Sequence, residues 1–380
     1  MTAPARILVA SPDSSSQDER YMRLALAVGA RNLGLTWPNP SVGAVVVRDG
    51  LVLGHGATQA GGRPHAERVA LEAAGVAARG ATLYVTLEPC SARSKSAYGA
   101  SCTDLLIQAG IRRLVIGAPD PSSFAHGAGF QRLEAAGVEV VSGVLADEAC
   151  RAHRGHVLRV TEGRPSVMLK LARTADGYAA RRGGGRLMIS GPLSNARTHL
   201  IRAHHDAIMV GIGTVLADDP LLTVRLPGLE HRSPVRVVID TNLRTPPGAQ
   251  LLTTSAEVPT WIVAGEDAPV EAERALVAAG AEVMRVSAHQ GRVDVAEALR
   301  LLASRGITRV FSEGGPNLAE ALIEADLIDE LATATSRTPL GEEGLAALGP
   351  KLSGALDARF RLVSTDDLGA DVLDIYERER

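Results

Sequence analysis

Two kinds of hydrophobic spacing alternate along the first part of the chain. Apolar residues that recur about every three or four positions are typical of amphipathic helices, and short continuous apolar runs are typical of buried strands. The first spacing predicts helices at residues 20–31, 66–78 and 104–109. The second predicts strands at residues 41–48, 51–54, 82–87, 114–116 and 138–141, with a turn at Asp49-Gly50 after the first of them. Strands that alternate with helices predict an α/β sandwich.

A helical segment at residues 147–159 separates this pattern from a second one. A new strand at residues 166–172 opens the second alternation, which continues to the end of the sequence. We therefore expect domains at 1–146 and 166–380, joined by a junction segment at 147–165. The basic residues of the junction helix, Arg151, His153, Arg154 and His156, fit a solvated surface better than a binding site.

Composition limits the class of protein. The 380 residues suffice for two domains with separate cores. A net charge of −3 and an aromatic content of 3% give little support for nucleic-acid binding. The beginning of the sequence is too polar for a signal peptide, and no apolar run approaches the roughly 20 residues that span a bilayer. Three cysteines, Cys90, Cys102 and Cys150, do not make a disulfide framework. We expect a cytoplasmic protein without a membrane or nucleic-acid partner.

One group of residues has the pattern of a catalytic zinc site. His65 and Glu67 lie at the start of a predicted helix, Cys90 follows a predicted strand, and Cys102 opens the next helix. An imidazole and two thiolates are three zinc ligands, and catalytic zinc sites leave the fourth position to water. Glu67 is placed to exchange protons with that water, as in the His-x-Glu and Pro-Cys signature of nucleobase deaminases. The second cysteine lies further along than the Cys-x-x-Cys spacing of that signature.

These residues belong to sequence motifs that resemble those of one protein family and follow one another in the same order as in that family. The motifs are Trp37-Pro-Asn-Pro-Ser-Val-Gly-Ala44, Gly62-Arg-Pro-His-Ala-Glu67, Tyr84-Val-Thr-Leu-Glu-Pro-Cys90 and Cys102-Thr-Asp-Leu-Leu-Ile-Gln-Ala-Gly110. They are similar to those of the bifunctional deaminase/reductase family of riboflavin biosynthesis. The resemblance implies a cytidine-deaminase-like α/β/α sandwich with zinc on His65, Cys90 and Cys102. It also implies Glu67 as proton donor, Asn39 as a substrate contact, and diaminohydroxyphosphoribosylaminopyrimidine as the substrate that releases ammonia.

The second half contains a strand-to-helix turn suited to an anion. A predicted strand at 308–311 ends in Ser312-Glu313-Gly314-Gly315, and Pro316 begins a helix that reaches about residue 325. Glycines allow close backbone approach, and a helix start presents free N–H groups. Taken alone, this motif fits an ordinary strand-to-helix turn at least as well as an anion-binding site.

The family resemblance continues through this half. The matching segments are Lys170-Leu-Ala-Arg-Thr-Ala-Asp-Gly177, residues 202–225 and Ser312-Glu-Gly-Gly-Pro-Asn-Leu318. The resemblance implies a dihydrofolate-reductase-like domain that uses NADPH. The preference for NADPH over NADH rests on the family resemblance alone. It places cofactor contacts on Ala172, Met188, Thr214, Asp218, Gly315, Pro316 and Asn317. It places substrate contacts on Arg202, Leu222, Arg225 and Glu313, where the two arginines suit a phosphorylated sugar.

Several points stay open at the level of sequence. The segment 91–101 between the two cysteines differs from the usual family loop, and we hypothesise that Arg93 or Lys95 in it binds the substrate phosphate. A deaminase of nucleosides or tRNA would explain the zinc motif but not the second half. A degenerate fusion that only binds ligands is another alternative. Association into a homo-oligomer is not decided.

Overall fold

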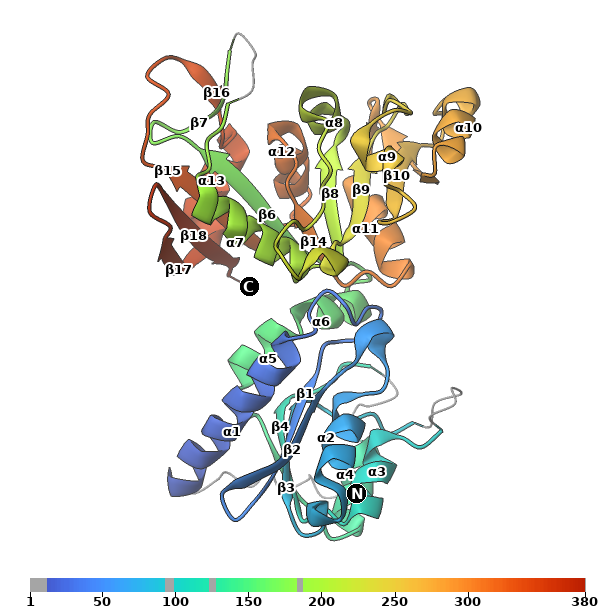
Figure 1. Cartoon of the computed structure of the whole chain (residues 1–380), viewed down its shortest axis with the longest axis vertical. Coiled ribbons are helices and arrows are strands. Elements are labelled where there is room, and N and C mark those ends of the chain that lie inside the picture. Colours follow the sequence, from blue (N-terminus) through green and yellow to red (C-terminus); the bar gives the residue numbers. More distant parts are fainter. Residues whose placement is uncertain (1–11, 93–98, 123–127, 183–186, 380) are drawn as a thin grey trace. The chain divides into compact units, whose positions relative to one another are not determined.

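The computed structural model divides into two compact units, Met1–Gly163 and Arg164–Arg380 (Figure 1). The structure describes residues 12–92, 99–122, 128–182 and 187–379. Arg93 and Lys95 lie outside the described residues. The units divide within the predicted 147–165 junction, and most of that segment belongs to the first unit.

The first unit has helices against a central sheet. Its described helices and strands are α1 (Pro12–Ala30), β1 (Gly43–Arg48), β2 (Leu51–Ala57), α2 (Ala66–Ala74), β3 (Thr82–Leu87), α3 (Cys102–Ala109), β4 (Arg113–Ala118), α4 (Ala128–Ala135), β5 (Glu139–Ser142), α5 (Ala146–Ala152) and α6 (Arg154–Thr161). Short 3-10 turns cover Ala60–Gly62 and Gly75–Ala78.

The described strands of this unit form a five-stranded sheet in the order β2-β1-β3-β4-β5. β1 runs antiparallel to β2 and β3, whereas β3, β4 and β5 are parallel. The predicted strand 82–87 is observed without change, while the first helix begins earlier than predicted. Gly54 allows α2 to lie directly on β2, because a Cβ there would come within 2.5 Å of the Ala70 carbonyl oxygen. This close packing fixes the helix that begins next to His65.

The junction helix differs from its prediction in two ways. It is two helices, α5 and α6, that meet at His153. His153 and His156 are buried, so the predicted solvated face is wrong for these two residues. His153 Nε2 lies 2.9 Å from Thr86 Oγ1, and His156 Nε2 lies 3.0 Å from an Asp120 carboxylate oxygen. Buried hydrogen-bond partners on β3 and after β4 therefore draw these histidines inward, which helical spacing alone does not reveal.

The second unit is a larger α/β domain. Its described helices and strands are β6 (Ser166–Arg173), β7 (Tyr178–Arg181), α7 (Pro192–Ala203), β8 (Ala207–Gly211), α8 (Ile212–Asp218), β9 (Val235–Ile239), α9 (Gln250–Thr253), β10 (Thr260–Gly265), α10 (Val270–Ala278), β11 (Glu282–Val286), β12 (Ala288–His289), β13 (Arg292–Val293), α11 (Val295–Ser304), β14 (Arg309–Ser312), α12 (Pro316–Glu324), β15 (Glu330–Ser336), β16 (Gly344–Ala346), α13 (Pro350–Arg359), β17 (Phe360–Asp367) and β18 (Asp371–Arg378). A 3-10 turn covers Glu230–Arg232.

The main sheet of this unit has nine strands within the described residues, in the order β11-β10-β9-β8-β14-β6-β15-β18-β17. The strands from β11 to β15 in this order run parallel, and β18 and β17 form an antiparallel edge. β6, β14 and α12 agree closely with the elements predicted at 166–172, 308–311 and 316–325. Parallel strands end at one edge of a sheet, where ligands bind in open α/β folds.

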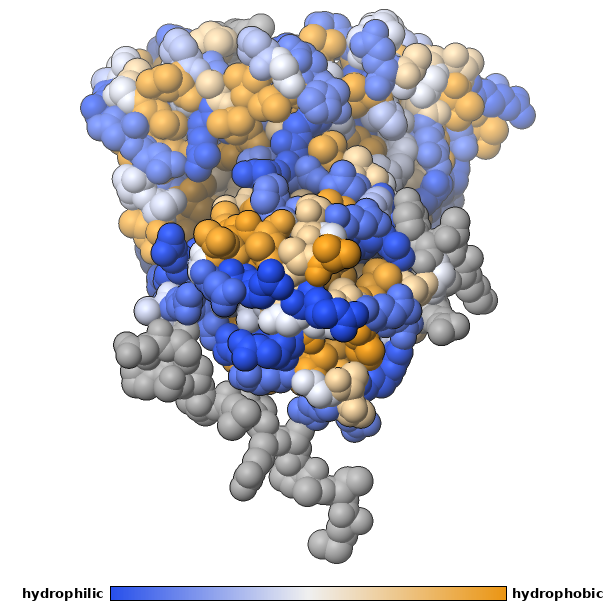
Figure 2. Space-filling view, turned by 60° about the horizontal axis from the view of Figure 1, so that its bottom comes forward, coloured by the Kyte–Doolittle hydropathy of each residue, from blue (hydrophilic) through white to orange (hydrophobic). Residues whose placement is uncertain are grey.

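The surface of the described residues mixes polar and apolar groups. Hydrophilic residues separate the hydrophobic patches on the face drawn in Figure 2. Among the described helices, none has both the length and the apolar character that a membrane span requires.

Candidate active sites

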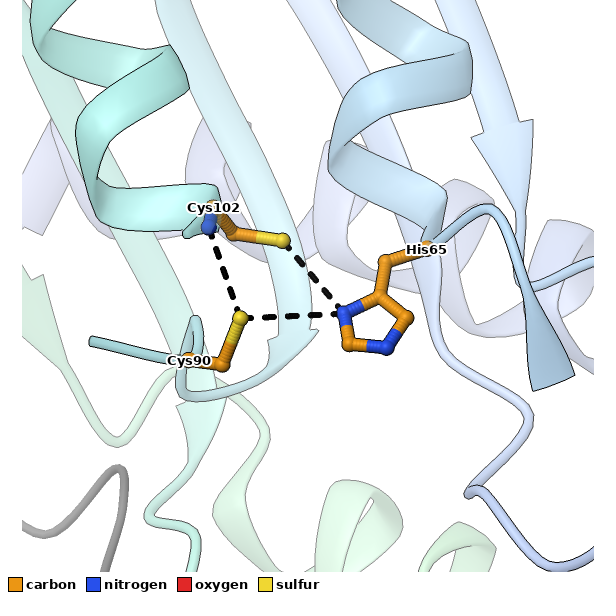
Figure 3. Close-up of side chains that lie close together, drawn as sticks. All are labelled: His65, Cys90 and Cys102. Atoms are coloured by element: carbon orange, nitrogen blue, oxygen red, sulfur yellow. Dashed lines mark hydrogen bonds between the residues drawn. The ribbon is translucent and has the colours of Figure 1, made fainter. Parts of the chain in front are cut away.

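Three side chains of the first unit converge on one point (Figure 3). His65 Nδ1 lies 3.8 Å from Cys90 Sγ and 3.4 Å from Cys102 Sγ. All three ligand atoms lie within 4.8 Å of one another. Zn–N bonds of ~2.1 Å and Zn–S bonds of ~2.3 Å in a tetrahedral site place nitrogen and sulfur about 3.6 Å apart. The three predicted ligands therefore fit zinc in both chemistry and spacing.

Local structure explains why these side chains meet. His65 is the N-cap residue of α2, and Cys102 is the first residue of α3. Ser101 and Asp104 form a capping box that fixes the start of α3. Cys90 follows β3, and its Sγ accepts a hydrogen bond from the Cys102 backbone N–H at 3.4 Å. Two helix starts and one strand end thus bring the three predicted ligands together.

The electrostatics of the site favour a thiolate and a protonated acid. Hydrogen bonding from Cys102 lowers the pKa of Cys90 to about 4 and outweighs the opposing effect of burial. Burial raises the pKa of Glu67, whose side chain is 3% exposed. A raised pKa makes this carboxyl group a stronger proton acceptor, which suits a residue that takes up a proton and passes it on.

Asn39 lies against the segment that leads to His65. Its Nδ2 donates to the Gly62 carbonyl oxygen at 3.0 Å. Gly62 has a φ of +84°, and a Cβ there would come within 2.3 Å of Asn39 Nδ2. Glycine is therefore required at this position for Asn39 to reach the backbone of the segment that leads to the predicted ligand His65.

A buried polar chain that we did not predict lies at the same edge of this sheet. Glu88 follows β3 and accepts a hydrogen bond from the Asp120 backbone N–H at 3.4 Å. Asp120 follows β4 and bonds His156. Burial tends to raise the pKa of Asp120, but hydrogen bonds from His156 and Ser122 lower it. The sequence could have indicated this polar chain, because Glu88 and Asp120 each come shortly after a strand and neighbouring parallel strands end side by side.

The second unit contains a cleft of about 1620 Å³ at the carboxyl ends of its parallel strands. The residues predicted for substrate and cofactor in this half all line it: Ala172, Met188, Arg202, Thr214, Asp218, Leu222, Arg225, Glu313, Gly315, Pro316 and Asn317. They come from many segments of the chain, and the fold brings them to one place. Asn39 belongs to the first unit.

A partly buried ion pair lies within the cleft. Arg202 Nε donates to one carboxylate oxygen of Glu313 at 2.6 Å, and its Nη2 donates to the other at 3.0 Å. Burial opposes ionisation of Glu313, but Arg202 and the more distant Lys170 outweigh it and lower the pKa of this carboxyl group. Glu313 is therefore held as a carboxylate with its oxygens oriented by a bidentate partner.

One wall of the cleft is the start of α12. Gly315 is its N-cap residue, and Pro316, which has no N–H, is its first residue. The Leu318 backbone N–H donates to the Gly315 carbonyl oxygen at 3.1 Å. The positive end of the helix dipole at this start favours a phosphate. Met188 lies on the lining as well, and 69% of its surface is exposed.

Comparison with known proteins identifies the two units. The family model of the cytidine and deoxycytidylate deaminase zinc-binding region matches residues 15–118, and that of the RibD C-terminal domain matches residues 165–373. Riboflavin biosynthesis protein RibD of Escherichia coli (strain K12) is 36% identical over 370 residues, which cover 94% of this chain and 98% of that protein. The chain belongs to the RibD family.

Solved structures agree with this assignment over the whole chain. RibD of Acinetobacter baumannii has a TM-score of 0.84 at 30% identity and covers 96% of this chain and 100% of its own. A diaminohydroxyphosphoribosylaminopyrimidine deaminase/5-amino-6-(5-phosphoribosylamino)uracil reductase from Thermotoga maritima has a TM-score of 0.81 at 31% identity, with the same coverage of 96% and 100%. The predicted cytidine-deaminase-like and dihydrofolate-reductase-like domains are confirmed. As a RibD protein, the chain is a bifunctional riboflavin-biosynthesis enzyme with a zinc-binding deaminase domain and an NADPH-using reductase domain.

The cleft of this RibD chain also contains residues that the sequence analysis did not single out. Lys170 on β6 lies among the lining residues, and burial lowers its pKa. Thr241 and Arg244 follow β9 and line the same cleft. The feature that could have indicated these residues is their position in the chain, because each lies on or shortly after a parallel strand of the sheet that carries Glu313. Only the order of the strands in the sheet shows that these positions are neighbours.

Proposed function

We propose that the first unit replaces the ring amino group of diaminohydroxyphosphoribosylaminopyrimidine with oxygen and releases ammonia. We further propose that the second unit reduces the ribosyl chain of the aminouracil product to a ribityl chain. The observation that carries the proposal is the set of His65, Cys90 and Cys102 with buried Glu67 at the same helix start. The name of the similar Thermotoga maritima protein gives the same two reactions.

In the deaminase site, His65, Cys90 and Cys102 would hold zinc. When bound, zinc would act as a Lewis acid and lower the pKa of a water molecule. The raised pKa of Glu67 suits a carboxyl group that takes a proton from the attacking water and passes it to the departing amino group as ammonia leaves. Asn39, held to Gly62, would orient the pyrimidine beside these groups.

In the reductase cleft, Arg202 and Arg225 would bind the substrate phosphate. Burial and the neighbouring Arg202 lower the pKa of Arg225, so the two guanidinium groups repel each other and an anion near both relieves the repulsion. Glu313 would accept hydrogen bonds from sugar hydroxyl groups. The N-terminus of α12 would hold a phosphate of NADPH, which supplies the hydride.

A coupled assay tests the proposal. The full chain is incubated with the phosphoribosylaminopyrimidine and NADPH, while ammonia and nicotinamide absorbance are followed together. We expect ammonia release to precede loss of absorbance, and omission of the substrate to abolish both. Ammonia without NADPH oxidation would refute the reductase half. Deamination of free nucleosides or tRNA, but not of this substrate, would refute the deaminase half.

Two further expectations belong to this proposal. The proposed partners are small phosphorylated pyrimidines, and association into a homo-oligomer stays open. We propose a cytoplasmic setting, because reducing conditions keep the Cys90 and Cys102 thiols available for zinc. We also propose that the two units fold and work separately, since each has its own buried core.

A further inference from the structure

The loop that carries Arg225 follows α8 and ends before β9. Leu222 in this loop has a φ of +55°, which is unusual for a residue with a side chain. A segment with such a conformation persists only where neighbouring groups hold it. Side chains of other elements bond its backbone: Arg202 Nη1 donates to the Thr223 carbonyl oxygen at 2.9 Å, and Arg236 Nη1 donates to that of Leu221 at 3.3 Å.

His199 makes a third such contact. The Arg225 backbone N–H donates to His199 Nδ1 at 3.3 Å. His199 lies on α7 three residues before Arg202, so both side chains leave the same face of the helix. A neutral imidazole can accept at Nδ1 only when its proton is on Nε2. Burial and the neighbouring Arg202 and Arg225 lower the pKa of His199, whereas Glu313 and a backbone hydrogen bond with Thr223 oppose this. The neutral form that can accept is therefore favoured.

Arg225 needs such support more than Arg202 does. Arg202 is fixed by its bidentate pair with Glu313, whereas Arg225 is an exposed residue on the cleft lining. An exposed arginine has many rotamers, and fixing its backbone reduces the entropy lost when it binds an anion. We propose that His199 is a positioning residue of the reductase, which holds the Arg225 backbone so that this guanidinium faces the substrate phosphate. The inference rests on the proposed function of Arg225.

Steady-state reductase kinetics of the full chain test this role. One net hydrogen bond corresponds to a change of about two- to twelve-fold in an equilibrium constant. For His199→Ala we expect KM for the aminouracil substrate to rise about five-fold, with kcat and the KM for NADPH within about two-fold of the parent. Ammonia release by the same samples controls for the amount of intact chain, and the unchanged KM for NADPH shows that the second unit is folded.

Two matched variants separate positioning from general packing. In His199→Asn the amide oxygen stands near the place of Nδ1, so KM should return to within about two-fold of the parent. In His199→Gln the amide stands nearer to Nε2, and KM should stay raised. Equal rescue by both variants, or a parental KM for His199→Ala, would overturn the inference.

Arg225→Ala distinguishes this inference from the proposed function. If Arg225 binds the phosphate, its loss raises KM, and adding His199→Ala to it has little further effect. A parental KM for Arg225→Ala refutes the proposed role of Arg225, and the inference with it. A raised KM for Arg225→Ala together with fully additive effects in the double variant refutes the inference alone.

Discussion

At the scale of single residues, the balance between burial and neighbouring charge sets the chemistry of both sites. Glu67 is buried and Glu313 is partly buried, and their pKa values move in opposite directions. Burial dominates for Glu67, whereas Arg202 next to Glu313 outweighs it there. One carboxyl group is therefore suited to carry a proton and the other to remain an anion.

The proton-shuttle role of Glu67 has a direct test. Glu67→Gln keeps the size of the side chain but cannot exchange a proton. We expect this variant to keep one zinc per chain and to lose ammonia release by roughly 10²- to 10⁴-fold. Metal analysis and an ammonia assay measure the two effects. Cys102→Ser is the control, since it should lose zinc as well, and normal turnover by Glu67→Gln would rule out the role.

A buried histidine should make the second unit sensitive to acid. Burial and the nearby Arg309 lower the pKa of His205 to about 3, from an ordinary value of 6.5. Between these values the unfolded chain binds a proton that the folded chain does not, so stability falls as pH falls below 6.5. Above pH 6.5 this residue has no effect. The slope is at most about 1.4 kcal/mol per pH unit.

Comparison with His205→Asn isolates that slope. The His205 Nδ1–H donates to the Ile201 carbonyl oxygen at 2.7 Å, and the asparagine amide can replace this donor without titrating. The chain has two tryptophans, so a Trp37→Phe background leaves Trp261 on β10 to report on the second unit. Denaturant titrations from pH 7.5 to 5 give the stability difference. A difference between the variants that does not change with pH would contradict the expectation.

At the scale of elements, α4 contacts the chain close to both cysteines. Arg132 Nη1 donates to the Ser91 carbonyl oxygen at 2.9 Å, and Nη2 pairs with Asp104. Ser91 follows Cys90, and Asp104 belongs to the capping box that positions Cys102. One side chain thus bonds next to both sulfur ligands.

Removal of this side chain should loosen the zinc site without unfolding the unit. The Arg132 side chain is 44% exposed, so its ion pair contributes little, and the backbone hydrogen bond adds ~1 kcal/mol. We expect Arg132→Ala to lose zinc to a chelator about five-fold faster than the parent. Arg23→Ala removes a surface ion pair of 3.0 Å with Glu19 on α1 and is the matched control. Equal rates for all three proteins would show that the contact does not stabilise the site.

At the scale of the whole molecule, the two units meet the requirements of separate domains. Each has its own sheet and its own buried cluster of apolar side chains. The contacts of α5 and α6 place them with the first unit: Ala149 is fully buried there, and His153 and His156 bond Thr86 and Asp120.

Truncation tests where the deaminase domain ends. We expect residues 1–163 to fold alone and bind zinc. Residues 1–146 should be markedly less stable, because the cut leaves Thr86 and Asp120 without these partners and exposes the apolar surface under α5. Thermal unfolding and zinc content of the two pieces measure this. The complementary piece 164–380 should reduce the deaminated substrate with NADPH, and equal stability of 1–146 and 1–163 would place the boundary earlier.

The sequence by itself predicted the α/β alternation, the grouping of His65, Cys90 and Cys102, and the turn at Gly315, and the structure has each of them. Each depends on local features, namely spacing, helix starts and glycine. Tertiary structure alone decided that His153 and His156 turn inward and that His199 reaches Arg225. It also brought Lys170, Thr241 and Arg244 to one cleft. The physical reason is that strand order and buried hydrogen-bond partners join residues far apart in the chain, and no periodicity along one segment records them.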